Sequence, residues 1–132
     1  MSVVTRTKAD VRALAGYESV KGEAGATCEA GEILYLDGTN GWKPANGGAA
    51  ATALARGVLV SPQDVVDGDK DLSIVTRGRI TGFSGMTPGA TYFVSDTAGE
   101  LDTATGTKTK RVGWAVTATI LMVDLSVNAD PA

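Results

Sequence analysis

The sequence predicts an all-β domain, a compact β-barrel or β-sandwich built from short antiparallel strands. Glycine accounts for 17 of the 132 residues, whereas aromatic residues make up only 5%. This composition suits short strands joined by tight turns, with a core of aliphatic side chains. Apolar stretches also recur at short intervals, and turn residues end them. The length fits one ordinary domain and is too short for two.

The predicted strands follow one another from residue 26 onward. They are residues 32–36, 57–60, 71–76, 79–83, 90–95, 100–102, 112–116 and 119–125. The dipeptides Asp37-Gly38 and Asn40-Gly41 mark a turn after the first of them. Segments 45–53 and 103–110 are rich in small or polar residues and are predicted to be loops.

Residues 1–25 do not follow this pattern, and two interpretations remain open for them. In the first, Thr7 caps a short helix that ends at Gly16. In the second, the segment is an extended arm that becomes ordered on a neighbouring protein. The predicted organisation is an N-terminal arm or short helix (1–25), a β-barrel or β-sandwich domain (26–126) and a C-terminal tail (127–132).

The two halves of the β region resemble each other. Residues 31–37 align with residues 89–96 when one insertion is allowed, and residues 57–61 align with residues 113–117 at a nearly constant offset. We interpret this as an internal duplication of a unit in which a hairpin precedes two further strands. Chance similarity between two glycine-rich β segments is the alternative. Neither unit can bury its apolar face alone, so we expect the two to close on one another around one core.

The chain contains no histidine and one cysteine, Cys28. A Ser-His-Asp triad, a Cys-His pair, an internal disulfide and a zinc site built from His and Cys are therefore excluded. We predict that the protein is not an enzyme and uses no cofactor. We also predict that Cys28 is a small buried side chain rather than a nucleophile, because no imidazole is present to activate it.

The charge balance is mildly acidic. Lys and Arg number 12 against 15 Asp and Glu, which gives a formal net charge of −3. A protein dedicated to nucleic acid usually carries a basic stripe, so nucleic acid is not an expected partner. No apolar run of about 18 residues is present, and the first residues lack the apolar segment of a signal peptide. We therefore expect no membrane association.

An acidic cluster is the most suggestive candidate for a metal site. Asp67, Asp69 and Asp71 lie at alternate positions and could gather around a hard cation such as calcium. However, Lys70 lies inside the cluster, and the segment lacks the spacing and the distal Glu of a calcium-binding loop. A solvated turn is the favoured interpretation.

Two other features point to binding surfaces. Arg77 and Arg79 are two residues apart on a predicted strand, so they share one face of it. Because the chain is acidic overall, an acidic protein partner is favoured over phosphate. Trp42 and Trp114 could stack on sugars, although packing in the core or at its rim is the more common role for such rings.

The first half of the β region has a recurring pattern of strand and turn residues in segments 30–37, 55–60 and 74–78. This pattern resembles capsid decoration (cement) proteins of tailed phages. In the second half, residues 86–95, 112–116 and 121–125 are similar to a β module that is widespread in phage virion proteins, tail fibres included. Together the resemblance covers roughly residues 25–126 and excludes the N-terminal segment.

The resemblance implies a virion structural protein that binds the outside of the assembled head and stabilises the capsid lattice. The alternative is a tail-fibre or receptor-binding β module that recognises carbohydrate. The implied partner is the major capsid protein, with homo-oligomerisation favoured as a trimer, and the implied location is the capsid surface after assembly in the host cytoplasm. The N-terminal segment would act as the arm that reaches neighbours. The expected capsid contacts within it are Val3, Val4, Arg6, Lys8, Arg12 and Tyr17.

Overall fold

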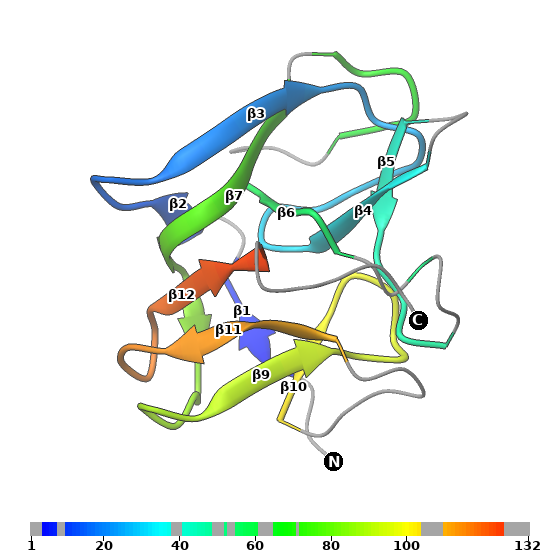
Figure 1. Ribbon diagram of the computed structural model, residues 1–132. Coiled ribbons are helices and arrows are strands. Elements are labelled where there is room, and N and C mark those ends of the chain that lie inside the picture. Colours follow the sequence, from blue (N-terminus) through cyan, green and yellow to red (C-terminus); the bar gives the residue numbers. More distant parts are fainter. Residues whose placement is uncertain are drawn as a thin grey trace.

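The structure is a computed structural model that describes residues 4–7, 10–37, 41–48, 52, 55–60, 65–70, 72–103 and 110–125. Within these residues nearly all regular structure is β-strand, and the antiparallel sheet curls into a half-barrel (Figure 1). The all-β prediction is therefore confirmed. Among the described residues, no helix has the length and apolar character needed to cross a membrane.

The strands are short, with one exception at the centre of the sheet. They are β1 (Thr5–Arg6), β2 (Arg12–Ala13), β3 (Glu18–Gly22), β4 (Ile33–Asp37), β5 (Gly41–Pro44), β6 (Gly57–Leu59), β7 (Leu72–Thr81), β8 (Phe83–Ser84), β9 (Thr91–Val94), β10 (Leu101–Asp102), β11 (Arg111–Ala115) and β12 (Leu121–Asp124). The predicted strands 71–76 and 79–83 correspond to one long strand, β7, and the short strand β8. Gly78, with φ of 132°, lets β7 continue where another residue would be strained.

Strand β7 organises the whole sheet. The strand order is β10-β9-β11-β12-β7-β6-β4-β5, and β2 and β3 also pair with β7. Ile80 pairs with Leu121 of β12 and with Ala13 of β2, so both edges of β7 are occupied there. Ile74 pairs in the same way with β6 and β3. The long green strand that connects the upper and lower parts of Figure 1 is this shared element.

The two halves share one strand order, as the duplication interpretation predicts. The series β5-β4-β6-β7 in the first half corresponds to β10-β9-β11-β12 in the second. The halves were expected to close on one another around one core, and the larger buried cluster does contain residues of both, such as Ile33 and Tyr92. The two halves are also continuous in one sheet, because β7 has ten residues and can pair with β6 through its first half and with β12 through its second.

The described residues of the N-terminal segment form strands and not the short helix from Thr7 to Gly16, which was one of the two open interpretations. Within residues 10–16 the regular element is β2, and β1 and β3 lie on either side of it. Two isolated helical turns are marginal in water, whereas extended backbone gains hydrogen bonds at the open edges of β7 and β8. The described part of this segment is thus integrated into the sheet of its own chain.

These N-terminal strands also connect distant edges of the sheet. The Val4 N–H donates to the Leu101 carbonyl at 2.9 Å, which joins the start of β1 to β10 while β1 pairs with β8. The Trp42 N–H donates to the Glu23 carbonyl at 2.9 Å, which joins the end of β3 to β5. A single N-terminal segment therefore connects the outer strand of each half to the centre of the sheet.

Two apolar clusters fill the interior. The smaller consists of Ala24, Cys28, Leu34, Trp42, Leu59, Val65, Leu72 and Ile74. Cys28 is fully buried, as predicted. Its burial is the main reason that the pKa of its thiol is raised to about 12, and the negative charge of nearby Glu32 is the second. Trp42 is 7% exposed and belongs to this core, so it offers no ring face to a ligand. The larger cluster is shared by the two halves of the sheet: it includes Ile33 and Val58 of β4 and β6 together with Tyr92, Val112 and Leu121 of β9, β11 and β12.

Candidate functional site

The outer side of β9, β11, β12 and β7 carries a ladder of directly opposed side chains. Trp114 lies opposite Thr91 on one side and Met122 on the other, and Met122 lies opposite Arg79. Residues directly opposite each other in a sheet point to the same face. The alternate residues of these strands point inward and are buried: Tyr92, Ala115, Leu121, Val123 and Ile80. The ladder is therefore held on a rigid, well-packed support.

A β-bulge places Trp114 on this outer side. The pairing of β11 with β9 shifts register between Arg111 and Gly113. Val112 and Ala115 are both fully buried, three residues apart, and Trp114 between them is 45% exposed. In a regular strand residues 112 and 114 would share a face, so the extra residue of the bulge turns the indole from the core to the surface. Bulges are over-represented next to binding sites for this reason.

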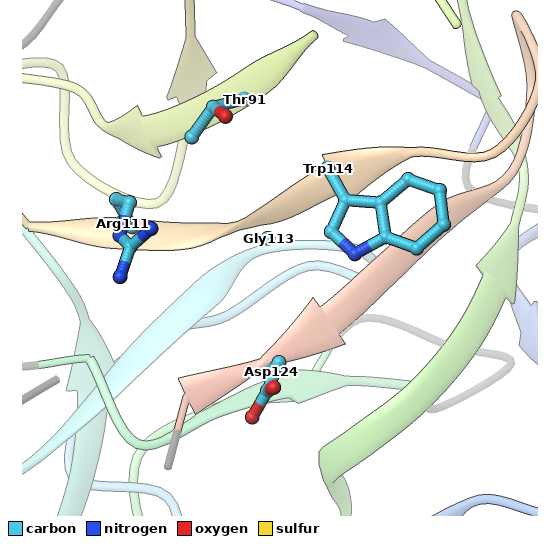
Figure 2. Close-up of a pocket in the computed structure, with 5 residues that line it drawn as sticks. All are labelled: Thr91, Arg111, Gly113, Trp114 and Asp124. Carbon is cyan, nitrogen blue, oxygen red and sulfur yellow. The ribbon is translucent and has the colours of Figure 1, made fainter. Parts of the chain in front are cut away.

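The exposed indole borders a small hollow. Its lining residues are Thr91, Arg111, Gly113, Trp114 and Asp124, and its volume is about 110 Å³. Figure 2 shows the indole between β11 and β12, with the hydroxyl of Thr91, the guanidinium of Arg111 and the carboxylate of Asp124 around it. The hollow thus combines an aromatic face with a hydroxyl group, a positively charged hydrogen-bond donor and a negatively charged acceptor.

Arginines surround the ladder. Arg77 lies opposite Asp124 and Arg79 opposite Met122, so the prediction that these two arginines share a face is confirmed. Arg12 lies opposite Thr81, which is two residues beyond Arg79 on the same side of β7. Together with Arg111, four of the six arginines of the chain are exposed on this side. We call the surface formed by Arg12, Arg77, Arg79, Arg111, Trp114 and Met122 the arginine–tryptophan face.

A second, wider hollow adjoins this face at Arg12. Its volume is about 370 Å³, and it is lined by Thr7, Asp10, Arg12, Thr81, Gly82, Phe83, Ser84 and Thr119. The lining consists mostly of hydroxyl groups and backbone, with one charge of each sign. It lies where the N-terminal segment meets β7 and β8, so it belongs to the part of the chain in which capsid contacts were expected.

The expected contact residues fall in different environments. Val3 and Lys8 lie outside the described residues. Arg12 is exposed, and Tyr17 is 47% exposed at the turn between β2 and β3. Val4 is half-buried and packs against the larger core cluster. Arg12 and Tyr17 are thus the described members of the set whose side chains are freely presented to a partner.

Arg6 differs from the expected surface contact because its side chain is only 7% exposed. Its Nη2 lies 3.0 Å from Glu29 and 4.0 Å from Glu32, and its Nη1 forms an ion pair with Glu100. Its Nε donates to the Ala30 carbonyl at 2.9 Å. Arg6 therefore attaches β1 to acidic residues from both halves of the sheet, and its charge is used within the chain.

The Arg6 cluster makes the stability of the protein depend on pH through Glu32. Burial raises the pKa of the Glu32 carboxyl, and this outweighs the hydrogen bond from the Glu29 N–H and the attraction of Arg6. A carboxyl with a raised folded-state pKa favours the folded state while protonated. That contribution is fully present below the unfolded pKa and is lost as the pH rises through the folded-state pKa.

We therefore expect Glu32→Gln, which keeps an acceptor but removes the charge, to gain stability relative to the unsubstituted protein as the pH rises from 4 to 7. Urea unfolding of both proteins across this range measures the difference in the free energy of unfolding. A difference that stays constant, or that falls as the pH rises, would contradict the assignment.

The acidic candidate for a metal site is only partly described. Asp67 and Asp69 are exposed, and Asp71 lies outside the described residues. The Asp69 Oδ2 accepts the Val66 N–H at 2.9 Å, a local turn contact of the kind expected from the solvated-turn interpretation. In the part of the chain that the structure describes, no group of three or more His, Cys, Asp or Glu side chains is placed to hold a metal ion.

Sequence reasoning singled out Arg77, Arg79 and Trp114 but not the surface that joins them, and it missed Arg111. The available signal was Gly113 inside an otherwise apolar strand, because an isolated glycine in a strand often marks a bulge. A bulge at this position moves Trp114 to the side of Arg111.

Comparison of the chain with protein-family models, with curated proteins and with solved structures gives no match. The geometry of the chain itself and the resemblance of its strand pattern are therefore the basis for a functional assignment.

Proposed function

We propose that the protein is a structural component of a phage virion that binds the outside of the assembled head and stabilises the capsid lattice. The observation that carries the proposal is the position of the segments that resemble decoration proteins in the first half and a β module of phage virion proteins in the second. They contain β4, β6, the middle of β7, β9, β11 and β12. These strands are adjacent in one sheet. The resemblance therefore coincides with the connected framework of the fold rather than with scattered loops.

The mechanism is the burial of an interface on the assembled shell. A protein that binds the lattice but not free capsid subunits shifts the equilibrium toward the intact shell by mass action. The partner is the major capsid protein, and a trimer would match its three-fold positions. Many copies bound across one lattice would multiply a modest contribution from each. The protein would reach this location on the capsid surface after assembly in the host cytoplasm.

Co-sedimentation tests this proposal directly. Purified protein is incubated with expanded capsids of the corresponding phage that lack it, and the capsids are then sedimented. We expect the protein to sediment with expanded capsids at a saturating, fixed ratio and to raise their thermal stability. Capsid subunits that have not assembled serve as the control and should not bind. Failure to co-sediment with expanded capsids would overturn the proposal.

A second candidate function is recognition of a carbohydrate receptor, and Trp114 favours it. The exposed indole, with Thr91, Arg111 and Asp124 beside it, offers a stacking surface and polar groups for sugar hydroxyls. Trp42 no longer supports this alternative because it is buried in the core. A glycan array probed with the protein and with Trp114→Ala tests it. Binding to a defined glycan that the variant loses would support this function, and an array without binding would reject it.

A further inference from the structure

We propose that the arginine–tryptophan face is the surface through which the protein docks onto an acidic protein surface. The inference rests on the proposed function, because the acidic surface is then a part of the assembled capsid. It goes further by naming the docking face and the chemistry of its partner. Of the described N-terminal contacts expected from the sequence, only Arg12 is part of this face.

The composition of the face is that of the energetic centre of a protein interface. Trp and Arg dominate the residues that contribute most to binding, and Met is also enriched at interfaces. Here Trp114, Met122 and Arg79 are directly opposed on three adjacent strands. With strands about 4.8 Å apart, the ladder from β9 to β7 extends over about 14 Å. It therefore forms one contiguous patch rather than isolated side chains.

The charge of the face is opposite to that of the chain. The chain as a whole carries a formal net charge of −3. The face carries Arg12, Arg77, Arg79 and Arg111. The neighbouring carboxylates are fewer: Asp124, Glu18, which lies 4.0 Å from Arg77, and Asp10, which lines the hollow beside Arg12. Such segregation orients a protein as it approaches an acidic surface and raises the rate of productive encounter. Arginine also pairs with carboxylates through two parallel hydrogen bonds, which lysine cannot form.

The face is pre-organised for binding. Its strands are backed by Ala115, Leu121 and Val123, all fully buried. The Trp114 orientation is set by the bulge and not by a mobile loop. Little conformational entropy is then lost when a partner binds, which leaves more of the contact energy as affinity.

The size of the hollow favours a protein side chain over a free small molecule. Sites that enclose small molecules usually have volumes of about 300–1,000 Å³. The hollow beside Trp114 measures about 110 Å³, which suits a single inserted side chain. A nucleic acid duplex is disfavoured because it carries about one negative charge per 1.7 Å. Asp124 and Glu18, which lie among the arginines, would repel this dense charge more strongly than the more widely spaced carboxylates of a protein.

The experiment compares four variants with the unsubstituted protein. Arg79→Glu, Arg111→Glu and Trp114→Ala alter the face. Lys70→Glu is the matched control, because it makes the same charge change at an exposed position outside the face. Thermal unfolding confirms that each variant is folded. Binding is measured to immobilised poly-L-glutamate, to a DNA duplex, to a neutral glycan array and to expanded capsids that lack the protein.

We expect the unsubstituted protein to bind poly-L-glutamate in preference to the DNA duplex, and more weakly as the salt concentration rises. Each of the three face variants should weaken binding to poly-L-glutamate and to capsids by about tenfold or more, whereas Lys70→Glu should not. No binding to poly-L-glutamate, tighter binding to DNA, or glycan binding that Trp114→Ala alone abolishes would overturn the inference. Capsid binding that the face variants retain would also overturn it, although the proposed function would stand. Binding to poly-L-glutamate but not to capsids would reject the proposed function, whereas the inference that the face binds acidic proteins would stand.

Discussion

Gly113→Ala is expected to lower the free energy of unfolding by about 3 kcal/mol or more. A Cβ at residue 113 would lie 2.8 Å from the Met122 carbonyl carbon, closer still to its oxygen, and 3.2 Å from the Val123 Cα. All three atoms belong to the backbone of β12, which cannot move away without breaking its pairing with β11. The substitution should also disturb the bulge and therefore the exposed position of Trp114.

Urea unfolding monitored by circular dichroism measures the loss, and Gly85→Ala provides the control. Gly85 has φ of 75°, and no neighbouring atom lies within 4 Å of the position that a methyl group would occupy, so its substitution carries conformational strain without a clash. We expect the free energy of unfolding of Gly85→Ala to fall by only about 1 kcal/mol. If Gly113→Ala were as stable as Gly85→Ala, the close approach of β11 and β12 would be refuted.

Arg6→Met is expected to have an effect of similar size, about 3 kcal/mol at neutral pH. Methionine keeps much of the apolar stem but removes the guanidinium. Glu29, Glu32 and Glu100 would then face one another without their shared cation, and the side chains of Glu32 and Glu100 are only 13% and 23% exposed. Removing one partner of a buried ion pair is costly because the remaining charge is left without compensation.

The loss of stability in Arg6→Met should become smaller as the pH is lowered, because protonation of the three glutamates removes the charges that Arg6 neutralises. Urea unfolding at pH 7 and at pH 4 measures this difference. Arg12→Met is the matched control, since Arg12 is exposed on β2, and its substitution should change stability by less than about 0.5 kcal/mol. Equal losses in the two variants would show that Arg6 does not hold β1 in place.

Apart from β5, the strands beyond residue 26 could be predicted because their signals are local. The apolar run of β4 and its flanking turn residues lie within a few positions of each other, and the same is true of β9. The N-terminal segment could not be predicted in this way. Thr5 pairs with Ser84, and Val4 donates to Leu101, so the partners that make this backbone extended are about eighty or more residues away. The sequence left a short helix and an extended arm open because those partners are absent from any short window.

The candidate site also has features that the local sequence predicts and features that depend on distant residues. Alternate residues of a strand point to the same face, so Arg77 and Arg79 can be placed on one side of β7 without knowing which strands lie beside it. The exposure of Trp114 depends on a register shift between two strands, which a single segment does not reveal. The burial of Arg6 likewise depends on Glu29 and Glu100, which reach it from separate parts of the chain.

The pairing of β1 with β8, and the hydrogen bond from Val4 to Leu101 of β10, set an order of events during synthesis. Residues 4 to 6 leave the ribosome about eighty or more residues before their partners at positions 83, 84 and 101. This early segment must therefore wait for its partners before it can find its place. Until it docks, the edges of β8 and β10 remain open to the same segment of another nascent copy. Exchange of N-terminal strands between copies is thus the characteristic folding error that this topology invites.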